Sequence, residues 1–172
     1  MRALRLIAIL MLVGTGAAAA ADDLTAVPTA EVIATAPAAH PATLYMLSAR
    51  LMEEGRPGEA AGWMYAGQLR YRFLLATLGD RAGEERVLFS ALTESIGRPI
   101  NETIAGDPDE WIAAMEWALE WDATHENALT SKAAFAAELA TIRSGLASLI
   151  ERVDANRQMI RQEREANGLP NR

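Results

Sequence analysis

The stretch LYMLSARLMEEGRPGEAAGWMYAGQLRYRFL, residues 44–74, decides the fold of this chain. Its first half has leucines at 44, 47 and 51, and these steps of three and four residues place them on one face of a helix. After the turn signal GRPG, a second stripe with the same steps consists of Ala60, Met64, Gly67, Tyr71, Leu74 and Leu78. The pattern predicts two helices, over 41–54 and 59–78, that pack as a hairpin.

Helical periodicity continues in the middle of the chain. A third helix is predicted over 83–96, with an inward face of Val87, Leu88, Ala91, Leu92 and Ile96. The segment GRPINETIAGDPDE, which starts at residue 97, holds two prolines and two glycines, so we expect mainly a turn-rich connector with one helical turn near 101–105. Asp107 before Pro108 predicts an N-cap, with Glu110 as its capping-box acid, for a fourth helix that ends near residue 122.

The last helix is predicted to be the longest, from a cap at Ser131 to Asn167. It would measure roughly 55 Å, whereas a compact domain of this size is roughly 40 Å across. Unless the helix bends, for instance at Gly145, its end RQMIRQEREANG projects into solvent or meets another chain. No segment alternates as a strand does, so the sequence predicts an all-α fold, a compact bundle of about five helices with a long C-terminal helix.

The N-terminus has the composition of an export signal. A basic start, MRALR, is followed by the apolar run LIAILMLVGTG and the small residues AAAAA, which predicts a signal peptide over 1–21 with cleavage near Ala21. An uncleaved membrane anchor is the alternative. Residues 22–40 hold two prolines and many small residues, and a third proline follows at 41, so we expect an extended or disordered arm, followed by a single α-helical domain over 41–172. The predicted location is the bacterial periplasm or the exterior.

Composition excludes several functional classes. The chain has no cysteine, which removes disulfides, thiol catalysis and cysteine metal sites. Cleavage after residue 21 would remove two of the 16 basic residues and no acid, so the net charge would change from −7 to −9. Such a chain repels nucleic acid and anionic lipid. No later apolar run is long enough to cross a bilayer, so no stable membrane insertion is expected after cleavage.

The opening stretch resembles a single tetratricopeptide or Sel1-like helical hairpin. The residues that carry the resemblance are Leu44, Leu47, Ser48 and Leu51 in the first helix, and Ala60, Met64 and Gly67 in the second. Leu51 stands where such units usually have an aromatic residue, Arg72 stands where they have a proline, and no second copy follows. The resemblance implies binding of a peptide or protein in a groove. WMYAGQLRYR and RPINETIAGD are also similar to exported proteobacterial proteins, a likeness that implies no activity.

Large aromatic and polar residues supply the candidate binding residues. Trp117 and Trp121 lie one helical turn apart, and exposed tryptophan or tyrosine near arginine is typical of protein interfaces. Asn101 either binds within a tight corner of its own chain or faces a ligand. The candidate binding residues are Trp63, Gln68, Arg70, Tyr71, Asn101, Trp117 and Trp121.

Candidate chemistry is limited to the sequence around WDATHEN. Asp122, His125 and Glu126 offer nitrogen and oxygen donors, but a helix-ending polar turn explains the same residues, and a structural zinc site usually needs four ligands. No nucleophile elbow, zinc-protease or phosphate-loop motif occurs. No catalytic residue, metal or cofactor is therefore assigned.

The sequence leaves three hypotheses of function. The favoured one is a non-enzymatic periplasmic protein that binds another protein or peptide near Trp63, Gln68 and Arg70, as an immunity or inhibitor protein or as an envelope-associated scaffold. The second is a small enzyme or metal-binding protein that uses Asp122, His125 and Glu126. The third is a structural homo-oligomer held together through residues 132–167.

Overall fold

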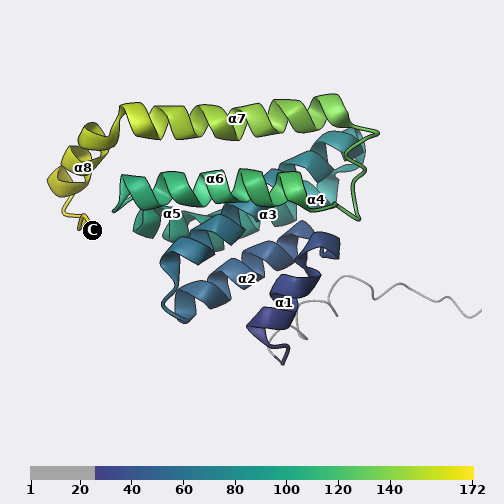
Figure 1. Cartoon of the computed structure of the whole chain (residues 1–172), viewed down its shortest axis with the longest axis horizontal. Coiled ribbons are helices and arrows are strands. Elements are labelled where there is room, and N and C mark those ends of the chain that lie inside the picture. The colour runs from purple at the N-terminus through teal and green to yellow at the C-terminus, as the bar shows by residue number, and fades with distance from the viewer. Residues whose placement is uncertain (1–25) are drawn as a thin grey trace, which may run out of the picture.

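A computed structural model describes residues 26–172, and within this range the chain forms helices and no strand, which confirms the all-α fold (Figure 1). The helices are α1 Thr29–Thr35, α2 Pro41–Glu53, α3 Pro57–Leu78, α4 Gly83–Leu92, α5 Arg98–Ile104, α6 Pro108–Thr124, α7 Ala136–Ala155 and α8 Arg157–Ala166. The predicted signal peptide lies outside the described residues. No helix between residues 26 and 172 is long and apolar enough to span a bilayer.

The two helices predicted from residues 44–74 are present as α2 and α3. Gly55 follows α2 with φ of 74°, a left-handed conformation that glycine adopts without strain. The Arg56 N–H donates to the carbonyl of Leu51 at 2.9 Å, and Pro57 supplies the first residue of α3. Farther along, a Cβ at Gly67 would lie 3.1 Å from the Cβ of Leu44. This glycine therefore permits α2 and α3 to pack closely.

Helix α3 forms the centre of the molecule. Every residue from Ala60 to Gly67 is buried, because α2 covers one side of the helix and α6 covers another. Helix α7 then lies across α6 and α3 as an outer layer, and α1 and α2 lie at the opposite side in Figure 1. The apolar residues of these layers form one continuous core, so the described chain is organised around α3.

The expected N-terminal arm is helical in its described part, so that prediction is wrong there. Helix α1 is followed by a 3-10 turn over Ala36–Ala38, and Val32 and Ala36 are 3% and 1% exposed. These two residues are four apart and form a short apolar helix face that packs on the core. Prolines lie beside and within these helical turns, at 28 and 37, where a missing N–H is tolerated.

The predicted connector at 97–107 is also largely helical. Helix α4 continues through a π turn, Thr93–Gly97, directly into α5. The wider π turn precedes Pro99 and accommodates its ring, which would clash in a regular helix. The inward face predicted for residues 83–96 is only partly correct. Leu92 is buried and Ile96 packs against the core as predicted, but Val87 and Leu88 are 71% and 42% exposed, and Phe89 packs inward in their place.

The long last helix is interrupted. Helix α7 ends at Ala155, and Asn156 adopts φ of −116° while its side-chain amide donates to the carbonyl of Arg152 at 2.6 Å. Helix α8 turns back from this point toward the start of α6 (Figure 1). The bend therefore lies at Asn156 and not at Gly145, and the arginine-rich end packs on its own chain.

Asp107 caps α6 as predicted, but the capping box does not form. The Asp107 carboxylate accepts hydrogen bonds from the N–H groups of Asp109 and Glu110, at 2.9 and 3.3 Å. The Glu110 carboxylate instead accepts a hydrogen bond from Arg172, the last residue, at 2.5 Å. The C-terminus is thereby held beside the beginning of α6.

Candidate functional site

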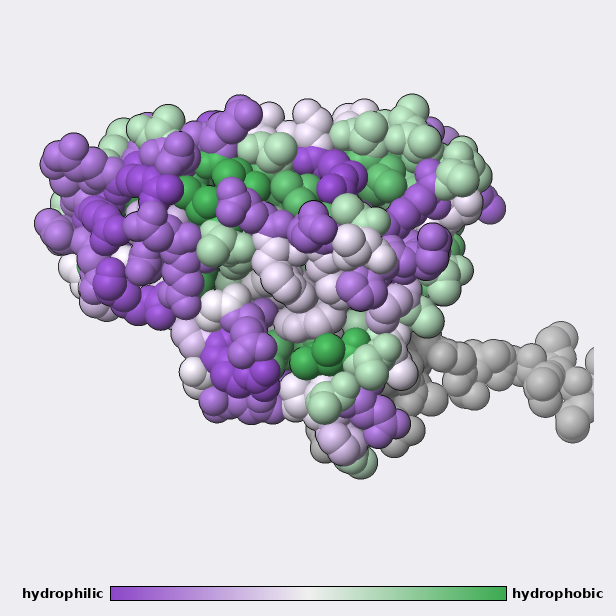
Figure 2. Space-filling model, in the orientation of Figure 1, coloured by the Kyte–Doolittle hydropathy of each residue, from purple (hydrophilic) through white to green (hydrophobic). Residues whose placement is uncertain are grey.

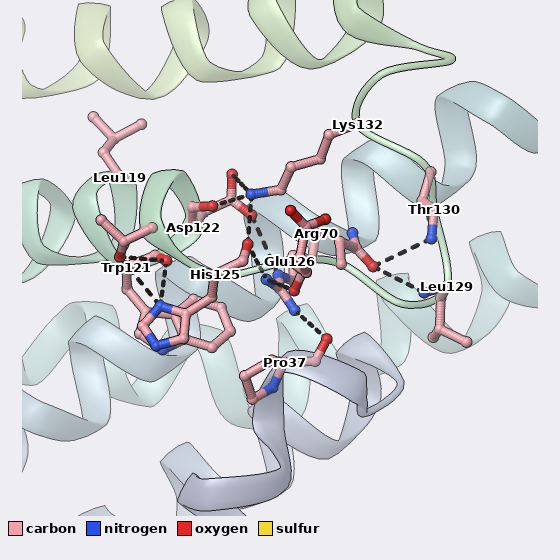
Figure 3. A network of polar contacts seen from close by, with 12 residues as sticks. Pro37, Arg70, Leu119, Trp121, Asp122, His125, Glu126, Leu129, Thr130 and Lys132 are labelled. Atoms are coloured by element: carbon pink, nitrogen blue, oxygen red, sulfur yellow. Dashed lines mark hydrogen bonds and ion pairs between the residues drawn. The ribbon is translucent and has the colours of Figure 1, made fainter.

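A buried ion pair lies where α3, α6 and α7 meet (Figure 3). Arg70 of α3 and Asp122 of α6 are each 1% exposed, and the Arg70 Nε donates to the Asp122 Oδ1 at 3.2 Å. Arg143 of α7 donates to the other carboxylate oxygen at 3.0 Å, and the Nζ of Lys132 lies 3.5 Å from that oxygen. The carboxylate thus contacts three cations and joins three helices.

The remaining donors of Arg70 are satisfied by main-chain carbonyls. One terminal nitrogen donates to the carbonyl of Pro37 at 3.0 Å, and the other donates to that of Glu126 at 2.9 Å. Its guanidinium carbon also lies 4.2 Å from the ring centre of Trp121, a cation–π contact. Burial lowers the pKa of Arg70, and the charge of Asp122 partly opposes this change. Arg70 therefore stabilises the fold and does not face a groove, contrary to the sequence-based prediction.

The predicted trio of Asp122, His125 and Glu126 does not converge. Asp122 is occupied by its cations, and the His125 Nδ1 lies 2.8 Å from the carbonyl oxygen of Trp121. Glu126 enters the network through its main-chain carbonyl, which accepts from Arg70. Within residues 26–172, no three side chains of the His, Cys, Asp and Glu types are placed to hold a metal ion.

Aromatic rings form a column along α6 from its surface to the buried ion pair. Trp117 and Trp121 stack with ring centres 6.2 Å apart, and Trp121 and His125 stack at 5.1 Å. Trp63 of α3 packs against both tryptophans at 5.0 Å with steeply inclined rings. Trp63 and Trp121 are buried, but Trp117 remains 40% exposed. Trp117 is therefore the one partly exposed ring of these three tryptophans.

A groove of about 250 Å³ lies between α3 and α6 beside Trp117. Its lining is largely apolar, and it consists of Gly58, Glu59, Gly62, Trp63, Glu110, Ala113, Ala114 and Trp117. A Cβ at Gly62 would lie 2.8 Å from the Trp117 ring, so the absence of a side chain there lets this ring lie against α3. The groove is therefore a product of glycines in α3 and alanines in α6.

The exposed face of α6 carries charge beside this groove. Ala113, Glu116, Trp117 and Glu120 follow at steps of three, one and three residues, which places them on one face, and all four are exposed. Neither Glu116 nor Glu120 forms a salt bridge with any residue that the structure describes. Trp117 is thus an aromatic residue beside two unneutralised carboxylates.

The other predicted site residues lie elsewhere. Tyr71 is buried and its hydroxyl donates to Glu85 at 2.6 Å, which makes it a core residue. Asn101 is half-buried and accepts a hydrogen bond from the Tyr65 hydroxyl at 2.6 Å, so it ties α5 to α3. Gln68 is half-buried in a second groove, between α3 and α7. Of the seven candidates, the structure brings only Trp63 and Trp117 to the α3–α6 groove, with Trp121 buried behind them.

Sequence reasoning missed the glycines of this groove and the acidic pair Glu116 and Glu120 beside it. The signal for Glu116 and Glu120 was present, because their spacing places them on the same face as Trp117. The pair Gly58 and Gly62 is spaced four apart at the start of α3, which indicates a close helix contact. The partners Arg143 and Lys132 of Asp122 had no sequence signal, because they come from distant segments.

Comparison with protein-family models, curated proteins and solved structures gave no match. The function is therefore argued from the site alone.

Proposed function

We propose that the protein is a non-enzymatic exported protein that binds a segment of another protein in the α3–α6 groove. The observation that carries this proposal is Trp117, a large aromatic side chain that is 40% exposed although Trp63 and Trp121 pack against it. A rigid, half-exposed aromatic residue beside an apolar groove is typical of residues that dominate the binding energy of an interface.

The charges around the groove define the chemistry of the partner. Glu116 and Glu120 flank Trp117 without a cation, and the full chain carries a net charge of −7. A segment with apolar residues for the groove and lysine or arginine beside them would complement this surface. Such a partner fits an immunity or inhibitor protein with a basic target, and it also fits an envelope-associated scaffold.

The periplasmic location and the tetratricopeptide-like character belong to the same proposal. The composition of residues 1–21 supports export. The close α2–α3 contact at Gly67 supports a likeness to a tetratricopeptide hairpin in packing. The binding surface proposed here, however, involves α3 and α6 and not the concave side of the α2–α3 hairpin.

The alternatives from the sequence have less support. An enzyme or metal protein at Asp122 would need the carboxylate that Arg70, Lys132 and Arg143 occupy. An oligomer through residues 132–167 was motivated by a projecting helix end, whereas α8 contacts α5 and α6 of its own chain.

Site-specific photo-crosslinking tests the proposal. Ala113 lines the groove and is exposed, so Ala113→p-benzoylphenylalanine in the exporting cell is expected to give a discrete adduct with another protein. The same replacement at exposed Ala137 of α7 serves as the control and is expected to give no such adduct. Adding Trp117→Ala should remove the Ala113 adduct. Equal adducts at both positions, or an adduct that persists without the tryptophan, would refute the proposal.

A further inference from the structure

A second groove, between α3 and α7, shares no lining residue with the α3–α6 groove. Its volume is about 140 Å³. Apolar side chains and one glycine form most of its lining, and three polar side chains complete it. The lining consists of Gln68, Leu69, Arg72, Ile142, Gly145, Leu146, Leu149 and Arg152. The two arginines distinguish this groove from the α3–α6 groove, whose charged lining residues, Glu59 and Glu110, are both acids.

The two arginines of this groove have no carboxylate partner among the described residues. Arginines of the surface typically pair with carboxylates, as Arg56, Arg98 and Arg157 do. Arg72 and Arg152 are both exposed, and neither forms a salt bridge with a residue between 26 and 172. In a chain with seven more acids than bases, two guanidinium groups without a carboxylate partner at one groove give a local excess of positive charge.

Helix geometry brings the lining residues together. Gln68 and Arg72 are one turn apart on α3, and the α7 positions 142, 145, 149 and 152 follow at three- and four-residue steps on one face. A Cβ at Gly145 would find no atom within 4 Å, so this position is open. The groove is thus bounded by fixed helices and has an unobstructed side at Gly145.

We infer that the α3–α7 groove binds a small carboxylate that carries a short apolar tail. The carboxylate would accept hydrogen bonds from Arg72 and Arg152, whose planar guanidinium groups match its geometry. The Gln68 amide adds a further donor, and the tail would lie against Leu69, Leu146 and Leu149. A groove of about 140 Å³ is well below the size of pockets for drug-sized ligands, so the tail must be short. This inference is independent of the proposed partner-binding function.

Binding of simple probes to the purified chain tests the inference. Hexanoate is the main probe; acetate lacks the tail, hexan-1-ol lacks the charge, and hexylamine reverses it. Isothermal titration calorimetry and amide chemical shifts are the readouts. Hexanoate should bind and shift the amides of α7 around Gly145, while the three comparison probes should bind at least about tenfold more weakly, as expected for loss of charge-assisted hydrogen bonds or of the apolar contact.

Variants assign the binding to this groove. Arg72→Gln and Arg152→Gln should each weaken hexanoate about tenfold, whereas Arg81→Gln, at an exposed arginine outside the groove, should have no effect. Gly145→Leu should block binding and Gly145→Ala should retain it, because the position is open to an added side chain. The inference is overturned if hexanoate does not bind, if hexan-1-ol binds equally well, or if the two groove arginines can be replaced without loss.

Discussion

At the scale of single residues, Asp122 illustrates how one carboxylate decides the arrangement of three helices. It is 1% exposed and lies within ion-pair distance of Arg70, Arg143 and Lys132. A buried charge is costly unless its partners remain in place. The side chains around it therefore have to keep their positions for the fold to be stable.

Asp122→Asn should lower the free energy of unfolding by about 3 kcal/mol, because Arg70 would remain buried without its counter-charge. Urea denaturation measures this loss. Asp109→Asn is the matched control, since Asp109 also contacts arginines but its side chain is 68% exposed. The free energy of unfolding of Asp109→Asn should fall by less than about 1 kcal/mol. Similar losses in the two variants would show that the buried pair is not critical.

Tyr65 is predicted to lower the stability of the folded protein at alkaline pH. Burial raises its pKa to about 12, despite the hydrogen bond from Trp111. Burial also raises the pKa of Tyr45 and Tyr71. From the ordinary value of 10.0 upward, the unfolded chain releases these protons while the folded chain keeps them, so stability must fall as the pH rises.

The free energy of unfolding should fall by up to about 1.4 kcal/mol per pH unit for each tyrosine, over the pH range between its pKa in the unfolded chain and its pKa in the folded chain. Urea denaturation from neutral pH to pH 12 measures it, with the phenolate absorbance as a direct readout of ionisation. Tyr65→Phe should lower stability at neutral pH, because Asn101 loses its donor, but should make the alkaline decline shallower. An unchanged decline in this variant would contradict the assignment.

At the scale of helices, the surroundings of Gly62 and Gly145 predict opposite effects on stability when each glycine is replaced by alanine. A Cβ at Gly62 would approach the ring of Trp117 to 2.8 Å, whereas a Cβ at Gly145 would contact nothing within 4 Å. Gly62→Ala should therefore destabilise the protein by about 1–3 kcal/mol through overpacking. Gly145→Ala should stabilise it by about 0.5–1 kcal/mol through helix propensity.

Thermal or urea unfolding of the two glycine variants provides the comparison, and each variant is the control for the other. If Gly62→Ala were as stabilising as Gly145→Ala, the contact between α3 and Trp117 would have to be looser than described. The groove beside Trp117 would then not have the defined wall on which the binding proposal depends.

Helix α8 should be attached mainly by charge, although its Ile160 packs against the core. None of its residues is buried, and Arg157 and Arg161 contact Asp109 and Asp107 at the start of α6. The double variant Arg157→Gln/Arg161→Gln should speed amide hydrogen exchange in residues 157–166 while the free energy of global unfolding changes by less than about 1 kcal/mol. Unchanged exchange in α8 would show that other contacts hold it, and Arg81→Gln should leave exchange unaltered.

Helix positions followed from the sequence where apolar periodicity and capping were clear. The bounds of α2, α3 and the capped start of α6 agree closely with the prediction because leucine spacing, GRPG and Asp107–Pro108 act locally. The helical course through Pro99 depends on a π turn, and the break at Asn156 depends on contacts between α8 and α6. The prediction took proline as the end of a helix near residue 99 and followed apolar periodicity through residue 156, and both signals were misleading there.

At the scale of the whole molecule, the candidate site could be predicted only in part. Trp117 was recognisable as one of several tryptophans, but which ring stays exposed depends on how α3 and α6 pack. Arg70 looked like a groove residue because its charge suggested exposure, whereas the tertiary fold buries it with Asp122. Long-range pairing of charges is set by the completed fold, so a single sequence does not reveal it.

The whole molecule presents an acidic surface with hydrophobic residues gathered in limited areas. Figure 2 shows such residues along the boundary between α7 and the layer beneath it, surrounded by hydrophilic side chains. The two grooves open on different pairs of helices and have opposite charge, acidic beside Trp117 and basic beside Gly145. We therefore expect ligands of opposite charge at the two grooves.

The most direct test of the central claim is the dissociation constant for the partner captured at Ala113, measured by calorimetry with purified proteins. Trp117→Ala is expected to weaken binding by about thirtyfold, which corresponds to about 2 kcal/mol and is typical of a residue that dominates an interface. Leu88→Ala, which removes an exposed apolar side chain from α4, should leave the constant unchanged. Equal dissociation constants for the wild type and the Trp117→Ala variant would contradict partner binding in the α3–α6 groove.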